Sequence, residues 1–271
     1  MDNLKAKKRH PEEIAVYSAI YVCAAFSVLL LLGIIIYVFA KGARRVNWAF
    51  LTGVTSILHG TVGIAGNILN TLIIILLTMI ITTPIGVGAA IYLNEYAKPG
   101  KLVTVIIFAT ETLAGIPSII FGLFGMLFFG QLCHMGYSLL TGSLTLTLMV
   151  LPLVTRNTQE ALKTVPDSFR TGAVGLGAGK WYTIRTILLP SAMPGIVTGV
   201  ILAIGRIIGE SAALLFTAGS AHLLPKTFNA FLEKIFHSGG TLTIQLYLSA
   251  SKGEFEVAFG IAVVLLVIVL L

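Results

Sequence analysis

The stretch NILNTLIIILLTMIITTPIGVGAAIYL (residues 67–93) decides the fold class of this chain. It holds no charged residue, and it is longer than the roughly 20 apolar residues that a helix needs to cross a bilayer. The whole chain shares this character, being 56% hydrophobic and 11% charged with a mean hydropathy of +0.97. A water-soluble globule of 271 residues would need more polar surface. We therefore predict an integral membrane protein.

Charge gaps and turn residues divide the chain into six predicted membrane helices. The predicted helices cover residues 14–39, 67–93, 102–130, 137–156, 191–218 and 253–271. The fold class is accordingly all-α and polytopic, with an N-terminal tail at residues 1–13 and a single transmembrane domain at residues 14–271. The start of the chain has the charge pattern of a signal peptide, but its apolar segment is too long for one, so a retained first helix is predicted.

The distribution of positive charge predicts the orientation in the membrane. Eleven Lys and Arg residues fall in segments on the side of the N-terminus and six on the other side, which places the N-terminus in the cytoplasm by the positive-inside rule. The cluster at residues 41–45 opposes this trend. The net charge of +7 reflects topology, because no continuous basic face for nucleic acid is present. Cys23 and Cys133 lie in apolar runs, so neither a disulfide nor a metal site is predicted.

The longest strongly polar stretch, residues 156–190, is predicted to lie on the cytoplasmic side. Apolar residues recur in it at helical spacing, and Pro166 followed by Asp167 favours a helix start. One interpretation is an amphipathic helix that lies flat on the membrane, and the other is a helix that docks on a partner protein. The predicted apolar stripe consists of Val165, Phe169, Gly172, Ala173 and Leu176.

The spacing of Gly177, Ile187, Leu189 and Pro190 favours docking on a partner. These residues form the pattern G-x9-I-x-L-P, which resembles the signature loop of ABC importer permeases. The resemblance implies a type I permease architecture and a cytoplasmic coupling loop at residues 157–190 that seats on a separate ATPase subunit. The residues that it assigns to coupling are Phe169, Arg170, Thr171, Gly172, Ala173, Leu176, Gly177, Ile187, Leu189 and Pro190.

This loop departs from the family pattern at one place, where Thr171-Gly172-Ala173 replaces the usual Glu-Ala-Ala. The missing Glu removes one charged contact with the ATPase, and Arg170 is the candidate substitute. The run Gly175–Trp181 superficially resembles a phosphate-binding loop. Val174 stands where such a loop needs Gly, and Trp181 stands where it needs Ser or Thr. The chain itself is therefore not expected to bind ATP.

Arg206 and Glu210 fall near the middle of the predicted fifth span. Charged groups at that depth are costly unless they are paired, and they commonly mark a substrate pathway. Their i,i+4 spacing predicts that they share one helical face and neutralise each other. A purely structural pair is the alternative. The guanidinium of Arg206 fits phosphate oxygens in a bidentate way, and an ionised Glu210 accepts the proton of hydrogen phosphate, which sulfate lacks.

Three runs of sequence are similar to the phosphate permease family of ABC importers, PstA. They are Pro84–Tyr96, Ala114–Leu123 and Gly205–Ala218, the last resembling R-x-x-G-E-T-A-P-L-L-F-T-A. The resemblance implies a phosphate-translocating subunit in the cytoplasmic membrane of a prokaryote, with functional arginines at Arg206 and Arg156. It also implies that this subunit is not an enzyme and holds no cofactor. ATP and Mg would bind to a partner.

The resemblance further implies the partners. They are a sister permease (PstC), an ATP-binding subunit (PstB), an extracytoplasmic phosphate-binding protein (PstS) and membrane lipid, with no nucleic acid. Two other functions remain open. One is an ABC permease for sulfate, molybdate or phosphonate. The other is an ion-coupled secondary transporter that uses Arg206, Glu210 and Glu111 without an ATPase. Arg156 alone is equally compatible with an anchor at the membrane interface.

Overall fold

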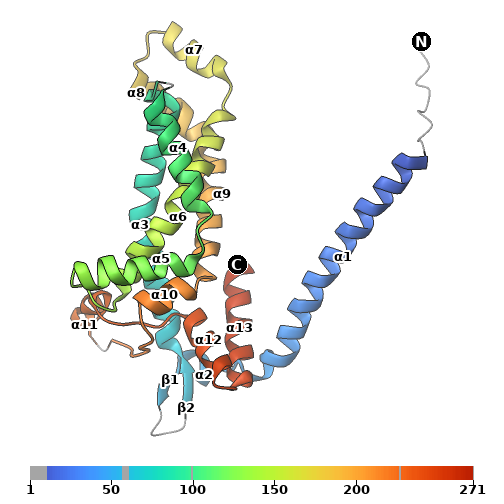
Figure 1. Cartoon of the computed structure of the whole chain (residues 1–271), viewed down its shortest axis with the longest axis vertical. Coiled ribbons are helices and arrows are strands. Elements are labelled where there is room, and N and C mark those ends of the chain that lie inside the picture. The colour runs from blue at the N-terminus through green and yellow to red at the C-terminus, as the bar shows by residue number, and fades with distance from the viewer. Residues whose placement is uncertain (1–10, 57–60, 99, 226, 271) are drawn as a thin grey trace.

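The structure is a computed structural model that describes residues 11–56, 61–98, 100–225 and 227–270. Helices form most of it, and Figure 1 shows their order along the chain by colour. The all-α prediction is confirmed apart from one short β-hairpin. Lys5, Lys7, Lys8 and Arg9 of the predicted tail lie outside the described residues, as do His59 and Lys226.

Within the described residues, four helices are long and apolar enough to cross a membrane. They are α1 (Pro11–Gly42), α3 (Ala65–Ile91) continued by η2 (Tyr92–Tyr96), α6 (Leu139–Lys163), and α9 (Leu189–Ile208) preceded by α8 (Lys180–Thr183) and η4 (Ile184–Leu188). A bent helix pair raises the number of candidate spans to five at most. The apolar helix α13 (Phe255–Leu270) has 16 residues. The predicted count of six spans is therefore not confirmed.

The predicted third span, residues 102–130, is broken. Its first half is α4 (Lys101–Ala114), and its second half is α5 (Ser118–Gly125) continued by η3 (Met126–Leu132). The two halves meet at an angle of 103°. Pro117 lies at the break, and a proline neither donates to the helical hydrogen-bond ladder nor allows the preceding residue to remain helical at low cost. Figure 1 shows α5 crossing beneath the long helices.

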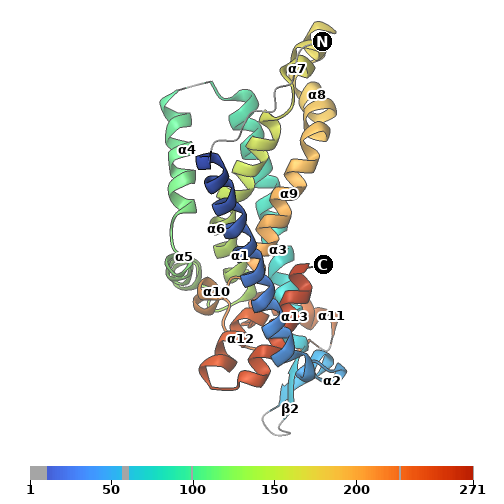
Figure 2. The same cartoon turned by 90° about the vertical axis from the view of Figure 1, so that its right-hand side faces the viewer.

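The centre of the molecule is formed by α3, α6 and α9, which run side by side in Figures 1 and 2. Leu146, Val150 and Val154 of α6 are fully buried between the other two helices. Small residues bring α9 close, since a Cβ at Gly199 would lie 2.7 Å from the Cβ of Asn157. Glycine at such positions is common where membrane helices pack.

The end of the molecule opposite α7 (Asp167–Gly175) carries the β-hairpin and several short elements. The hairpin pairs β1 (Val54–Ser56) with β2 (Thr61–Ile64) in antiparallel register. The other elements there are η1 (Ala43–Arg45), α2 (Trp48–Thr52), α10 (Ala212–Thr217), α11 (Phe228–Glu233), η5 (Lys234–Phe236) and α12 (Leu242–Ser251). Helix α1 contacts α13 near this end and then diverges from the bundle, as Figure 1 shows. No residue in the most apolar part of α1 is buried.

Gly122 sets the distance between α5 and α10, and its replacement tests this packing. A Cβ at Gly122 would lie 2.8 Å from the backbone Cα of Ala213, which cannot rotate away. Gly122→Ala is therefore expected to destabilise the protein by roughly 1–3 kcal/mol, as overpacking does. The matched control is Gly88→Ala in α3, where a Cβ meets nothing within 4 Å. Thermal unfolding in detergent should show a lower midpoint for Gly122→Ala only, and equal midpoints would contradict the packing.

Candidate functional site

Arg206 lies in the last turn of α9. Its side chain is exposed in the isolated chain, although Ile207 and Ile208 beside it are buried in the bundle. No ion pair involves Arg206 among the described residues. A guanidinium without a carboxylate partner, at the end of an otherwise apolar helix, is free to bind an anion.

Glu210 does not pair with Arg206, so the predicted i,i+4 pair is wrong. The helix ends at Ile208 with Gly209 as its cap, and a second helix, α10, starts at Ala212. The two charges therefore do not share a helical face. Glu210 instead accepts a hydrogen bond from the backbone N–H of Ala213 at 3.1 Å, where it caps α10. Its backbone carbonyl also accepts from the hydroxyl of Thr243 at 2.8 Å.

The same break corrects the predicted depth of Arg206. The prediction placed it in the middle of one straight span over residues 191–218, but this stretch is two helices. Arg206 therefore marks the point where α9 stops. Glu210 is half-buried in the turn that follows.

Arg156 lies on α6, seven residues before its end at Lys163, and not at the helix terminus. Its Nε donates to Glu160 Oε1 at 3.1 Å, and the side chains of both residues are more than half exposed. An exposed pair of this kind contributes little to stability. The Arg156 guanidinium can therefore exchange Glu160 for another anion at little cost in free energy.

Contacts between α6 and α9 show how the two arginines are arranged along the bundle. Gly199 of α9 packs against Asn157 of α6, so Arg156 lies at about the level of Gly199. Arg206 is seven residues further along α9, which corresponds to roughly 10 Å along the helix axis. The structure thus places two exposed arginines on two adjacent antiparallel helices, at different depths.

A second candidate site is the polar segment that contains α7. Helix α7 stands at one tip of the molecule, after α6 and before α8 (Figure 1). Arg170 fixes it there. The guanidinium donates to Glu95 Oε1 of η2 at 3.0 Å, to the backbone carbonyls of Leu162 and Val165 at 3.0 Å each, and to Asp167 Oδ1 at 3.0 Å.

These bonds make Arg170 a structural anchor between α7, the end of α6 and η2. The hydrogen bond to Glu95 raises the pKa of Arg170 above its ordinary value, so the group stays charged. The Glu95 side chain is only 9% exposed, whereas the Asp167 side chain is 92% exposed. Arg170 therefore points into this chain, where its charge is already engaged by Glu95 and Asp167.

The predicted apolar stripe of α7 is only partly buried in this chain. Val165 and Ala173 are buried, but Phe169 is 46% exposed and Leu176 is 91% exposed. Trp181 and Tyr182, just after the turn, are each 60% exposed. The stripe is divided in this way because α7 is short and only one side of it reaches the bundle. The exposed side is an apolar surface, a feature that often marks contact with a protein or a membrane.

The rest of the predicted coupling segment lies where helices end and begin. Gly177 has φ +81°, a left-handed conformation that favours glycine, and the turn to α8 starts there. Ile187 lies in η4, while Leu189 and Pro190 start α9. Residues 157–163 belong to α6, so the irregular part of the predicted loop is shorter than residues 157–190.

Glu95 and Glu160, which hold Arg170 and Arg156, were not predicted as partners from the sequence. The i,i+4 spacing of Arg156 and Glu160 was a usable signal. No local signal joins Glu95 to Arg170, because 75 residues separate them. Glu111 is exposed on α4, and no metal-binding group of three His, Cys, Asp or Glu residues occurs in the part of the chain that the structure describes.

Comparison with known proteins gives a consistent result. Residues 82–271 match the family described as "Binding-protein-dependent transport system inner membrane component". The chain is 37% identical over 246 residues to the "Probable ABC transporter permease protein YqgI" of Bacillus subtilis (strain 168), covering 89% of this chain and 84% of that protein. It is 38% identical over 181 residues to the "Phosphate transport system permease protein PstA" of Xylella fastidiosa (strain Temecula1 / ATCC 700964), covering 66% of this chain and 62% of that relative.

A solved structure has the same fold. It is described as "Inward facing conformations of the MetNI methionine ABC transporter: CY5 native crystal form", and it superposes with a TM-score of 0.56 at 20% identity. The match covers 76% of this chain and 88% of the other. At this identity the likeness concerns the fold alone, and it confirms the predicted permease architecture.

Proposed function

Because the chain belongs to the family of binding-protein-dependent transport system inner membrane components, we propose that it is the permease subunit of an ATP-driven importer that moves inorganic phosphate into the cytoplasm. The chain is a transport subunit and not an enzyme. An ABC importer permease works with an ATPase and with a substrate-binding protein. In this proposal the partners are the sister permease PstC, the ATPase PstB, which binds ATP and Mg, and the phosphate-binding protein PstS.

The choice of an anion as substrate rests on Arg206 at the end of α9, which has no ion-pair partner among the described residues. An arginine fork binds two phosphate oxygens at once, which gives both charge and geometry. Arg156, about two turns deeper along the bundle, offers a second cation whose present partner, Glu160, is exposed and easily exchanged. Phosphate would pass from one arginine to the other along α6 and α9.

Glu210 supports phosphate over sulfate in this proposal. One of its carboxylate oxygens caps α10, and the half-buried carboxylate lies four residues beyond Arg206. When ionised, a carboxylate only accepts hydrogen bonds, so it tolerates an anion that carries a proton and repels one that carries none. Hydrogen phosphate has such a proton at neutral pH, and sulfate does not.

The coupling role rests on the exposed apolar surface formed by Phe169, Leu176, Trp181 and Tyr182. We place the ATPase on this surface, which puts the α7 end of the molecule in the cytoplasm. That orientation agrees with the excess of positive charge on the side of the N-terminus.

Reconstitution tests the function. The chain is combined with PstC, PstB and PstS in vesicles, and ATP-dependent uptake of labelled phosphate is measured with excess sulfate or molybdate as competitor. Uptake that needs ATP and resists both competitors is the expected result. Uptake without the ATPase would contradict an ABC importer, and uptake abolished by sulfate or molybdate would contradict phosphate as the substrate.

A further inference from the structure

An apolar pocket lies between α4 and the bundle. It has a volume of about 440 Å³ and is lined by α3, α4, α5 and α6. Its walls are hydrocarbon except for Thr110 and Thr155. The hydroxyl of Thr110 already donates to the carbonyl of Ile106 at 2.8 Å, so it offers little to a polar guest. A pocket of this kind excludes phosphate, because an unpaired anion in apolar surroundings is strongly disfavoured.

One wall of the pocket is formed by a single face of α4, and one end is formed by α5. Ile106, Thr110 and Leu113 recur at helical spacing and line the pocket, while most of the other α4 side chains are exposed. The bend at Pro117 then carries α5 across one end of the pocket, where Phe121 and Phe124 line it. Figure 2 shows α4 set to one side of the α3, α6 and α9 bundle.

Neither Arg156 nor Arg206 is among the residues that line the pocket. It contacts the face of α6 that contains Leu148, Pro152 and Thr155, whereas Asn157 of α6 faces α9. Residues 148, 152 and 155 project from the opposite side of the helix to residue 157, by the rotation of about 100° per residue. Because the walls are apolar and include neither arginine, the occupant of the pocket is not the transported anion.

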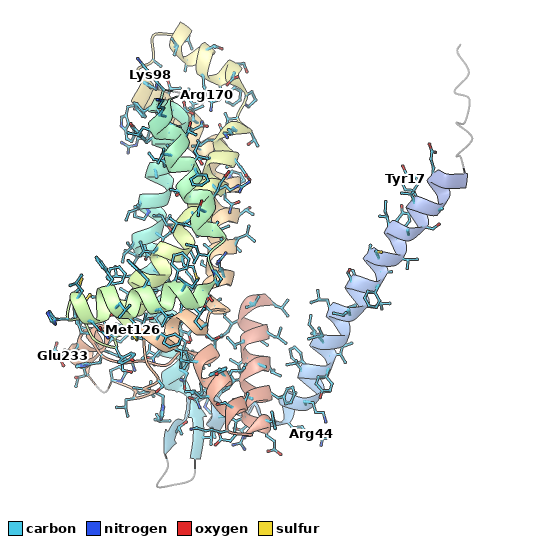
Figure 3. The ribbon with its side chains drawn as sticks, in the orientation of Figure 1. Tyr17, Arg44, Lys98, Met126, Arg170 and Glu233 are labelled. Atoms are coloured by element: carbon cyan, nitrogen blue, oxygen red, sulfur yellow. The ribbon has the colours of Figure 1, made fainter. Side chains whose placement is uncertain are left out.

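Leaving an apolar space of this size empty is unfavourable, and water does not fill a cavity that offers it no polar partners. Leu93 lines the α7 end of the pocket. Beyond it in the sequence come two exposed cations, Lys98 and Lys101. Figure 3 labels Lys98 toward the α7 end of the molecule. Cations at the membrane surface attract anionic head groups. A molecule with an anionic head and an apolar tail matches both features.

We propose that this pocket binds one acyl chain of an anionic membrane phospholipid, whose phosphate lies at Lys98 and Lys101. The lipid fills the space between α4 and α6 and so sets the position of α4 and of the bend that follows it. This site is additional to phosphate transport and does not depend on which substrate is carried.

Photo-crosslinking tests the site. The chain is purified with the subunits that accompany it and incubated with phosphatidylglycerol that carries a diazirine in its acyl chain. After illumination, labelled peptides are mapped by mass spectrometry. We expect labels to concentrate on the lining residues of α3, α4 and α6. Ala89→Trp, which fills the pocket, should lower this labelling at least about five-fold. Ala109→Trp, on the exposed side of α4, should leave it unchanged.

Two further measurements keep the test decisive. Phosphatidylcholine with the same diazirine chain should label the pocket less in the unaltered protein, and Lys98→Gln with Lys101→Gln should remove that difference. If Ala89→Trp does not fold, the comparison of the two lipids still decides. Equal labelling of the pocket and of the exposed face of α1 would overturn the site. Equal labelling of the pocket by both lipids would overturn the anionic head group.

Discussion

Arg206→Gln is expected to lower ATP-dependent phosphate uptake by roughly 10- to 100-fold, the range that corresponds to losing one hydrogen-bonded charge interaction with the anion. The reason is that Arg206 is exposed and lacks a carboxylate partner among the described residues. It also lies in the last turn of α9, just before the break that separates α9 from α10. Because its side chain is not buried, its removal should leave folding and subunit assembly intact. Uptake into vesicles and the amount of assembled complex are the two measurements.

Two further variants separate charge from shape at this position. Arg206→Lys keeps the charge but loses the planar fork, so an intermediate rate is expected. Arg44→Gln removes one exposed charge in η1, away from α9, and should transport at the normal rate. Normal uptake by Arg206→Gln would remove Arg206 from the pathway. An equal loss of phosphate uptake in Arg44→Gln would show that the net charge of the protein, and not the position of Arg206, is responsible.

The sequence predicted the membrane class and the positions of α1, α3 and α6 well, because each contains a long apolar run. It did not predict how two apolar runs divide. The runs 102–130 and 191–218 look continuous in hydropathy, yet each is broken, at Pro117 and at Gly209. Hydropathy reports whether a residue suits the bilayer, and it does not report whether the backbone remains helical. Pro117 was a visible signal for the first break. Gly209 was a weaker one.

The candidate site shows the same limit at the level of side chains. Arg206 and Glu210 were found from their charge in an apolar context, but the inference that they pair assumed a continuous helix. Once the helix ends at Ile208, Glu210 turns to cap α10 instead. Arg170 shows a second limit. Its main partner, Glu95, is distant in sequence, so only the fold brings the two together.

The bond between Arg170 and Glu95 leads to the second large prediction. Glu95 is the one nearly buried carboxylate that holds Arg170, and Arg170 ties α7 to the end of α6 through the carbonyls of Leu162 and Val165. Glu95→Gln removes the charge that orients the guanidinium, at a local cost of about 2 kcal/mol for a charged hydrogen bond. A movement of α7 with the ATPase would then no longer be transmitted to the membrane helices. We expect phosphate uptake to fall about 30-fold, the factor that corresponds to about 2 kcal/mol, while ATP hydrolysis falls far less.

Asp167→Asn is the matched control, because Asp167 bonds the same guanidinium at the same 3.0 Å distance but is 92% exposed. An exposed pair is screened by water and contributes little, so this variant should retain normal uptake per ATP hydrolysed. Hydrogen exchange should separate the two variants as well, with faster exchange over residues 165–176 in Glu95→Gln only. If both variants behave alike, burial of the carboxylate is not what anchors α7. If uptake and hydrolysis fall together in Glu95→Gln, the anchor supports ATPase docking rather than transmission of its motion to the membrane helices.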